Sequence, residues 1–116
     1  MRPIPLKIKK QISEDPFYKV CCITGSSNVS IEHCWSYGTK GQINELWALV
    51  PLRRDLNTSH PPKDVKDKCR LISLLRAKEL GVWEQIKKDY PRHDWEQELK
   101  YLSKKYARIS DTKTNY

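Results

Sequence analysis

The pattern of apolar and polar residues changes character along the chain, and three kinds of segment follow one another. Residues 1–16 mix prolines and lysines without periodicity, which predicts an extended basic arm. Residues 17–24 are rich in β-forming side chains and stop at a cluster of turn formers that begins with Gly25, which predicts a short strand. From residue 63 onward, apolar positions recur every three or four residues, as is typical of helices.

A β-hairpin is predicted between these segments. Residues 29–35 alternate between apolar and polar side chains, the period of a half-buried strand, and residues 46–50 form a continuous apolar run. A polar loop joins the two, as in a hairpin. Pro51 suits the first turn of a helix, and the prolines at 61–62 cannot continue one, so a short helix over residues 51–60 should follow the hairpin.

The C-terminal half is expected to be mainly helical. A first helix over residues 63–81 ends at Gly81, a favoured residue just after a helix. A second helix covers residues 82–90 and stops before a proline. Asp94 can cap a third, whose apolar stripe should face the core and consists of Trp95, Leu99, Leu102 and Tyr106.

The length of 116 residues allows one domain with a modest core. The fold class predicted is α+β, with a basic arm (1–16), a hairpin-containing core (17–62), a helical tail (63–109) and a frayed end (110–116). The chain carries 22 basic and 14 acidic residues, a net charge of +8, which favours a polyanion such as nucleic acid as partner. The alternative is that the surface lysines serve solubility alone.

Membrane insertion and secretion are not predicted. The chain has no apolar run long enough to cross a bilayer and no apolar signal core near its start, so a cytoplasmic location is expected. In a reducing compartment the four cysteines, Cys21, Cys22, Cys34 and Cys69, remain thiols. Zinc knuckles usually present ligands two to four residues apart, and the adjacent Cys21–Cys22 pair does not fit them, so no structural zinc is expected.

Three polar residues near the hairpin carry the chemistry of phosphodiester hydrolysis. That reaction needs a base to activate water and a cation to neutralise developing charge. Glu32 offers a carboxylate and Asn57 an amide oxygen, and magnesium needs only one or two such protein ligands. His33 offers a base that exchanges protons near neutral pH. Glu32 and His33 are adjacent, so a bulge or strand end must bring them to one face.

The stretch "IEHCWSYGTKGQINELWALVPLRRDLNTSH" resembles the HNH, or ββα-metal, endonuclease motif, and small phage-type HNH proteins with a helical tail look especially similar. The resemblance implies a hairpin-plus-helix core and a DNA endonuclease that uses Mg2+ or Mn2+, in a phage or a bacterial host cell. Many members brace the hairpin with a cysteine pair that has no counterpart here. Apolar packing should replace it, by Trp35, Leu46, Trp47 and Leu49.

The resemblance also implies a role for each motif residue. His33 matches the general base, Glu32 the acidic metal ligand, and Asn57 the ligand that the family places on the helix. Asn44 matches the middle asparagine that orients the histidine. Glu32 stands where aspartate is more usual, and Asn44 comes two residues before the leucine that the family's asparagine generally adjoins. His60, three residues after Asn57, is a competing metal ligand.

Three basic residues flank the proposed site, and Lys40, Arg53 and Arg54 could hold the phosphates on either side of the scissile bond, although the two arginines could equally form a solvated face. The substrate is expected to be DNA, with branched or nicked forms open, and the oligomeric state is open too. One alternative keeps the same scaffold as a non-cleaving nucleic-acid-binding or interaction protein. Another is a zinc-stabilised adaptor.

Overall fold

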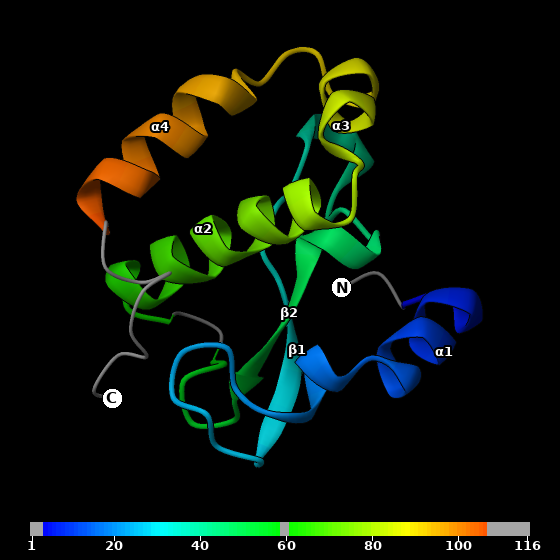
Figure 1. The fold of residues 1–116 in the computed structure, drawn as a ribbon, viewed down its shortest axis with the longest axis vertical. Coiled ribbons are helices and arrows are strands. Elements are labelled where there is room, and N and C mark those ends of the chain that lie inside the picture. The colour runs from blue at the N-terminus through cyan, green and yellow to red at the C-terminus, as the bar shows by residue number, and fades with distance from the viewer. Residues whose placement is uncertain (1–3, 59–60, 107–116) are drawn as a thin grey trace.

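A computed structural model describes residues 4–58 and 61–106 of the chain. The described part is an α+β structure with one antiparallel pair of strands and four α-helices (Figure 1). In chain order the elements are α1 (Leu6–Glu14), η1 (Pro16–Lys19), β1 (Val29–His33), η2 (Gly38–Lys40), η3 (Leu46–Ala48), β2 (Leu49–Arg53), α2 (Lys63–Glu79), α3 (Trp83–Asp89) and α4 (Trp95–Lys105), where η marks a 3-10 helix.

The predicted hairpin is confirmed, but its second strand is shifted. β1 pairs with β2 so that Val29 faces Arg53 and His33 faces Leu49. The predicted strand over residues 46–50 began three residues too early, because Leu46 opens the 3-10 turn η3. The Tyr18 hydroxyl lies 2.8 Å from the Leu46 carbonyl oxygen and 2.9 Å from that of Leu49, and anchors this turn at the start of β2.

The helix predicted over residues 51–60 is wrong for the part that the structure describes. Pro51 lies inside β2, opposite Ile31, and its carbonyl accepts a hydrogen bond from the Cys22 amide at 2.9 Å. The chain then turns, with the Asn57 amide donating to the Arg53 carbonyl at 3.0 Å. Proline fits the first turn of a helix and an edge strand alike, and a two-stranded sheet has only edge strands.

The N-terminal segment also differs from its prediction. Residues 6–14, predicted as part of an extended arm, form α1, which starts directly after Pro5 and ends before Pro16, so the prolines bound the helix without interrupting it. Ile8 and Ile12 are half-buried on one face of it, four residues apart. The strand predicted over residues 17–24 is absent from the structure, because η1 and turns occupy that stretch.

The three C-terminal helices are confirmed. Gly81, with φ of +74°, follows α2 as predicted, and the Val82 amide donates to the Ala77 carbonyl at 3.1 Å across this turn. The Asp94 side chain caps α4 by accepting from the Gln97 amide at 3.0 Å. Within the described ranges, no helix has both the length and the apolar character needed to cross a bilayer.

Tryptophans from the hairpin segment and from α4 join the two halves. The Trp95 ring lies edge-on to Trp35 at 5.1 Å and to Trp47 at 5.7 Å between ring centroids. The Trp35 indole donates to the buried Ser73 hydroxyl of α2 at 2.7 Å, so α2 is fixed to the same cluster. Of the predicted hairpin packing residues, Trp35, Trp47 and Leu49 are buried, and Leu46 is half-buried.

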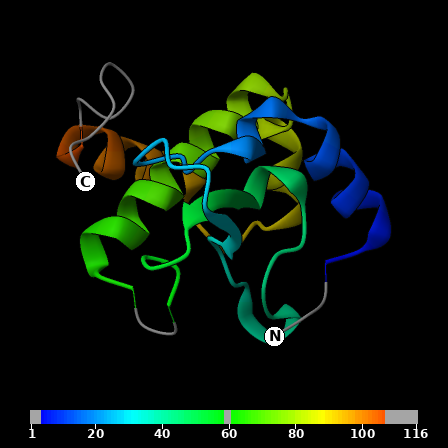
Figure 2. The ribbon, with the colours of Figure 1, turned by 90° about the horizontal axis from the view of Figure 1, so that it is seen from below.

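Helix α2 crosses the hairpin, while α1 and α4 lie on opposite sides of the molecule (Figures 1 and 2). Lys66 and Arg70 of α2 share a pocket with Glu32 and His33 at the end of β1. This position decides which helix supplies side chains to the site described next.

Candidate functional site

A pocket of about 410 Å³ lies at the end of β1, and both Glu32 and His33 line it. His33 is the last residue of β1, so the two neighbours need not follow the strict alternation of a continuous strand. Asn57 and Thr58 contribute the wall that follows β2, and Lys66 and Arg70 contribute the wall from α2. We call this cavity the site pocket.

The imidazole of His33 is held by Asn44. His33 Nε2 lies 2.7 Å from Asn44 Oδ1. The amide oxygen can only accept a hydrogen bond, so Nε2 donates, and in the neutral form of the ring the lone pair is on Nδ1. A side-chain partner of this kind fixes both the orientation of the ring and the nitrogen that can take up a proton.

Asn57 is tied to β1 by Ser30. Its Nδ2 donates to Ser30 Oγ at 2.7 Å. Ser30 and Glu32 are two residues apart on β1 and therefore share a face of the strand. Asn57 thus sits on the Glu32 side of the hairpin, although it follows a turn and does not lie on the helix that was predicted. The amide nitrogen donates this bond, and the amide oxygen remains as the atom that Asn57 can offer as a ligand to a cation.

Burial raises the pKa of the Glu32 carboxyl above its ordinary value. The His33 backbone amide and the positive charges of Lys66 and Arg70 oppose this rise without cancelling it. The carboxylate is thus incompletely compensated by the protein around it, and an added cation would stabilise its charged form.

The residues of the site pocket fit a hard divalent cation. One carboxylate oxygen from Glu32 and one amide oxygen from Asn57 are the ligand types that Mg2+ and Mn2+ accept, with water completing the shell. Within residues 4–58 and 61–106 no cluster of three or more His, Cys, Asp or Glu side chains could hold a metal.

Lys66 and Arg70 are site residues that the sequence did not single out. They are four residues apart on α2, so they share a helix face. The Arg70 guanidinium donates from Nε to the Cys34 carbonyl at 3.2 Å and lies 5.1 Å from the Trp35 ring centroid. The crossing of α2 over the hairpin brings this face to Glu32.

The two arginines that the sequence singled out lie outside the site pocket. Arg53 pairs with Asp55 at 2.5 Å, and Arg54 donates to Asn28 at 3.1 Å, and neither lines the site pocket. The backbone of Lys40 lies in η2, and its side chain is outside the described part of the structure. His60 also lies outside the described residues.

The cysteine beside His33 is a packed thiol. Cys34 is buried and donates from Sγ to the Cys69 carbonyl at 3.6 Å. Burial is the main cause that raises the pKa of the Cys34 thiol well above its ordinary value. For Cys69, a hydrogen bond with Cys22 and then burial raise the thiol pKa. High thiol pKa values disfavour the thiolate that a nucleophile or metal ligand requires.

The structure therefore brings Glu32, His33 and Asn57 to one pocket, with Asn44 behind the imidazole. Comparison of the chain with protein-family models, with curated proteins and with solved structures found no match in any of the three.

Proposed function

We propose that this protein is a metal-dependent endonuclease of the HNH type that hydrolyses phosphodiester bonds in DNA. The observation that carries the proposal is the convergence of Glu32, His33 and Asn57 on one pocket, with His33 held by Asn44 at 2.7 Å. Each requirement of the reaction has a residue: a base with a fixed tautomer, oxygen ligands for a cation, and positive charge for the substrate.

His33 acts as the general base. Its Nδ1 accepts the proton of a water molecule while Nε2 keeps its bond to Asn44 Oδ1. The water oxygen forms a new bond to phosphorus in line with the bond from phosphorus to the 3′-oxygen, which breaks. The 3′-oxygen gains a proton from solvent, so the products are a 3′-hydroxyl and a 5′-phosphate.

Glu32 and Asn57 would hold Mg2+ or Mn2+, and a bound cation supplies charge neutralisation at the phosphate and the leaving oxygen. Lys66 and Arg70 bind the phosphate oxygens from the α2 side of the pocket. The net charge of +8 contributes attraction to the DNA backbone that does not depend on sequence and that weakens with salt.

A supercoiled-plasmid assay tests the proposal. Wild-type protein should nick the plasmid with Mg2+ or Mn2+ and not with EDTA. His33→Ala should lower the rate by about 10²–10⁴-fold because it removes the base. Glu32→Gln should lower it because it removes the charged ligand, whereas Glu84→Gln, an exposed substitution on α3 outside the site pocket, should not.

Thermal unfolding monitored by circular dichroism is measured on each variant, so that a lost activity is not confused with a lost fold. Wild-type protein that binds the plasmid but does not cut it under any metal condition would refute the nuclease. That result would favour the alternative hypothesis, a non-cleaving nucleic-acid-binding protein on the same scaffold.

A further inference from the structure

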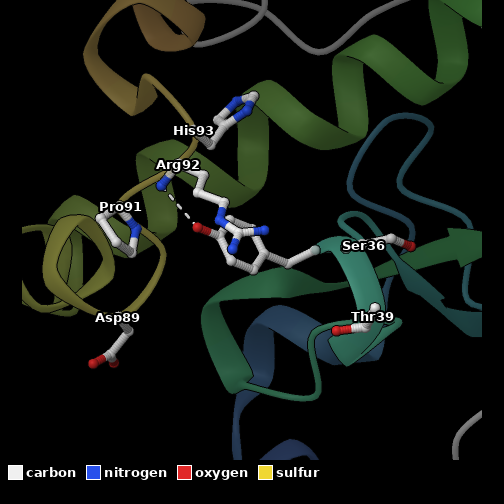
Figure 3. Close-up of a pocket in the computed structure, with 8 residues that line it drawn as sticks. Ser36, Thr39, Asp89, Pro91, Arg92 and His93 are labelled. Carbon is white, nitrogen blue, oxygen red and sulfur yellow. Dashed lines mark hydrogen bonds between the residues drawn. The ribbon is translucent and has the colours of Figure 1, made fainter.

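A second pocket, of about 470 Å³, lies between η2 and the linker that joins α3 to α4 (Figure 3). Tyr37 and Thr39 line it from the η2 side, and Pro91 and Arg92 line it from the linker. The Arg92 amide donates to the Tyr37 hydroxyl at 2.7 Å, which ties the two walls together. We call this cavity the linker pocket, and nothing in the proposed mechanism uses it.

The linker pocket adjoins the site pocket. Ser36 lines both cavities, and the walls are formed by consecutive residues of one stretch of chain. His33 and Tyr37 are four residues apart, so their Cα atoms are separated by at most about 14 Å. A strand whose scissile phosphate lies beside His33 can therefore place a neighbouring nucleotide in the linker pocket.

The lining of the linker pocket suits a nucleobase. Bases stack on tyrosine rings and on arginine guanidinium planes, and both side chains are present. Arg92 extends from the linker toward the segment that carries Ser36 and Thr39, whereas the carboxylate of Asp89 points away from that segment (Figure 3). His93 belongs to the core side, because its ring packs 4.4 Å from the Trp95 ring centroid and its Nε2 contacts Glu98 at 3.1 Å.

The dimensions favour a single nucleotide over a duplex. A volume of about 470 Å³ is within the range of small-molecule sites, and the cavity is bounded on two sides by η2 and by the linker. Bases of an intact duplex are stacked inside the helix and reach such a pocket only when they are flipped or already unpaired.

We propose that the linker pocket binds an unpaired base of the strand that is cut, through stacking on Tyr37 and Arg92. This inference rests on the proposed endonuclease function and names its substrate class: DNA with a single-stranded segment beside the scissile phosphate, such as a flap or a branch. Fully paired DNA of the same length binds more weakly because its bases cannot enter.

The test measures binding in EDTA, where no DNA is cut. Fluorescence anisotropy gives Kd for fluorescein-labelled oligonucleotides of one length, as a single strand, a flap and a full duplex. Wild-type protein should prefer the single strand and the flap. Arg92→Ala should weaken binding of these two forms about fivefold or more and leave duplex binding within twofold, because one stacking contact is lost.

Two further variants separate stacking from charge. Arg92→Lys keeps the charge and loses the planar group, so it should bind the flap as weakly as Arg92→Ala. Lys100→Ala removes one exposed charge from α4, outside both pockets, and should leave the preference for the flap unchanged. The proposal would be overturned if Arg92→Lys bound the flap as tightly as wild type, or if Arg92→Ala weakened binding of all three DNA forms equally. Arg92 would then be a contact to the DNA backbone.

The binding data also distinguish this inference from the function on which it rests. If wild-type protein prefers the flap in EDTA but never cuts it with metal present, the nuclease proposal is refuted and base binding in the linker pocket is retained. If the protein cuts plasmid DNA but binds duplex and flap equally, only the proposal of base binding in the linker pocket is refuted. A protein that binds none of the three forms in EDTA and cuts no plasmid with metal present would refute both.

Discussion

Tyr90, at the end of α3, donates a hydrogen bond from its hydroxyl to the carboxylate of Glu45, the residue that follows Asn44. The other oxygen of this carboxylate accepts from the Trp47 indole at 3.1 Å. Glu45 occupies the position that the resemblance assigned to the asparagine, and in the structure it fastens the loop that carries Asn44. Helix α3 thereby supports the orientation of His33 indirectly, through the loop that carries Glu45 and Asn44.

The first prediction follows from this contact. Tyr90→Phe keeps the ring and removes the hydroxyl, so the loop bearing Asn44 should loosen. We expect a loss of about 1 kcal/mol in the free energy of unfolding, measured with urea, and a three- to tenfold fall in kcat for nicking with little change in KM. Asn44→Ala should lower kcat further. An unchanged kcat in a destabilised Tyr90→Phe protein would show that the contact serves stability only.

The second prediction concerns the metal requirement. Asn57→Ala removes the amide oxygen, so the Mg2+ concentration that gives half the maximal nicking rate should rise at least tenfold, and excess Mg2+ should restore part of the rate. Asn57→Asp keeps an oxygen ligand and should stay active. Asn28→Ala is the matched control, because Asn28 is exposed and bonds to Arg54 outside the site pocket.

The sequence also offered His60 as a metal ligand in place of Asn57, and the same Mg2+ titration distinguishes the two. If Asn57 is the ligand, His60→Ala should keep the wild-type Mg2+ dependence. If His60→Ala were inactive and Asn57→Ala active, His60 and not Asn57 would be assigned as the metal ligand.

The sequence predicted the elements whose signals are local. Alternation identified β1, a spacing of three and four identified α2 and α4, and the cap at Asp94 and the turn at Gly81 were predicted from single residues. Pro51 misled because proline is compatible with a helix start and with an edge strand, and only the pairing with Ile31 selects the strand. The prolines around α1 similarly obscured a helix that they delimit.

The candidate site was predictable only in part, for a related reason. Glu32, His33 and Asn44 belong to one motif, and the bond between His33 and Asn44 matches the orienting role that the resemblance implied for Asn44. Lys66 and Arg70 come from a helix whose rotation relative to the hairpin is set by tertiary packing. Charge runs in the sequence indicated basic surface without indicating which lysines face Glu32.

The third prediction tests these two basic residues as substrate contacts. Lys66→Ala should weaken DNA binding and reduce the slope of log K against log salt concentration by about 1, because one phosphate contact is lost. Arg70→Lys should reduce the nicking rate more than binding, since a lysine cannot reproduce both the bond to the Cys34 carbonyl and the packing on Trp35. Filter binding at a series of salt concentrations gives the slope, and Lys100→Ala serves as the control. A salt response unchanged by Lys66→Ala would exclude Lys66 from the DNA contact.

The fourth prediction concerns stability and does not depend on the nuclease. Asp67 of α2 is buried, and its carboxylate accepts from Lys63 at 3.0 Å and from Lys105 of α4 at 3.5 Å. Burial alone would raise its pKa, but these two lysines outweigh burial, and the Asp67 pKa is lowered. A lowered carboxyl pKa stabilises the fold above the unfolded value of about 3.9, and this stabilisation is lost as pH falls through the lower folded value.

Asp67→Asn should therefore lower the free energy of unfolding by about 1–2 kcal/mol at pH 7, a modest amount because both lysines are partly in solvent. The difference between wild type and variant should shrink as the pH falls below about 4, because the Asp67 carboxyl of the unfolded chain takes up a proton there before the carboxyl of the folded protein does. Asp64→Asn is the control on the same helix, since Asp64 is half in solvent and lies 3.9 Å from Lys68. Urea unfolding at pH 7 and at pH 3 measures both variants. A difference that is the same at the two pH values would mean that packing of the side chain, and not the charge of Asp67, links α2 to α4.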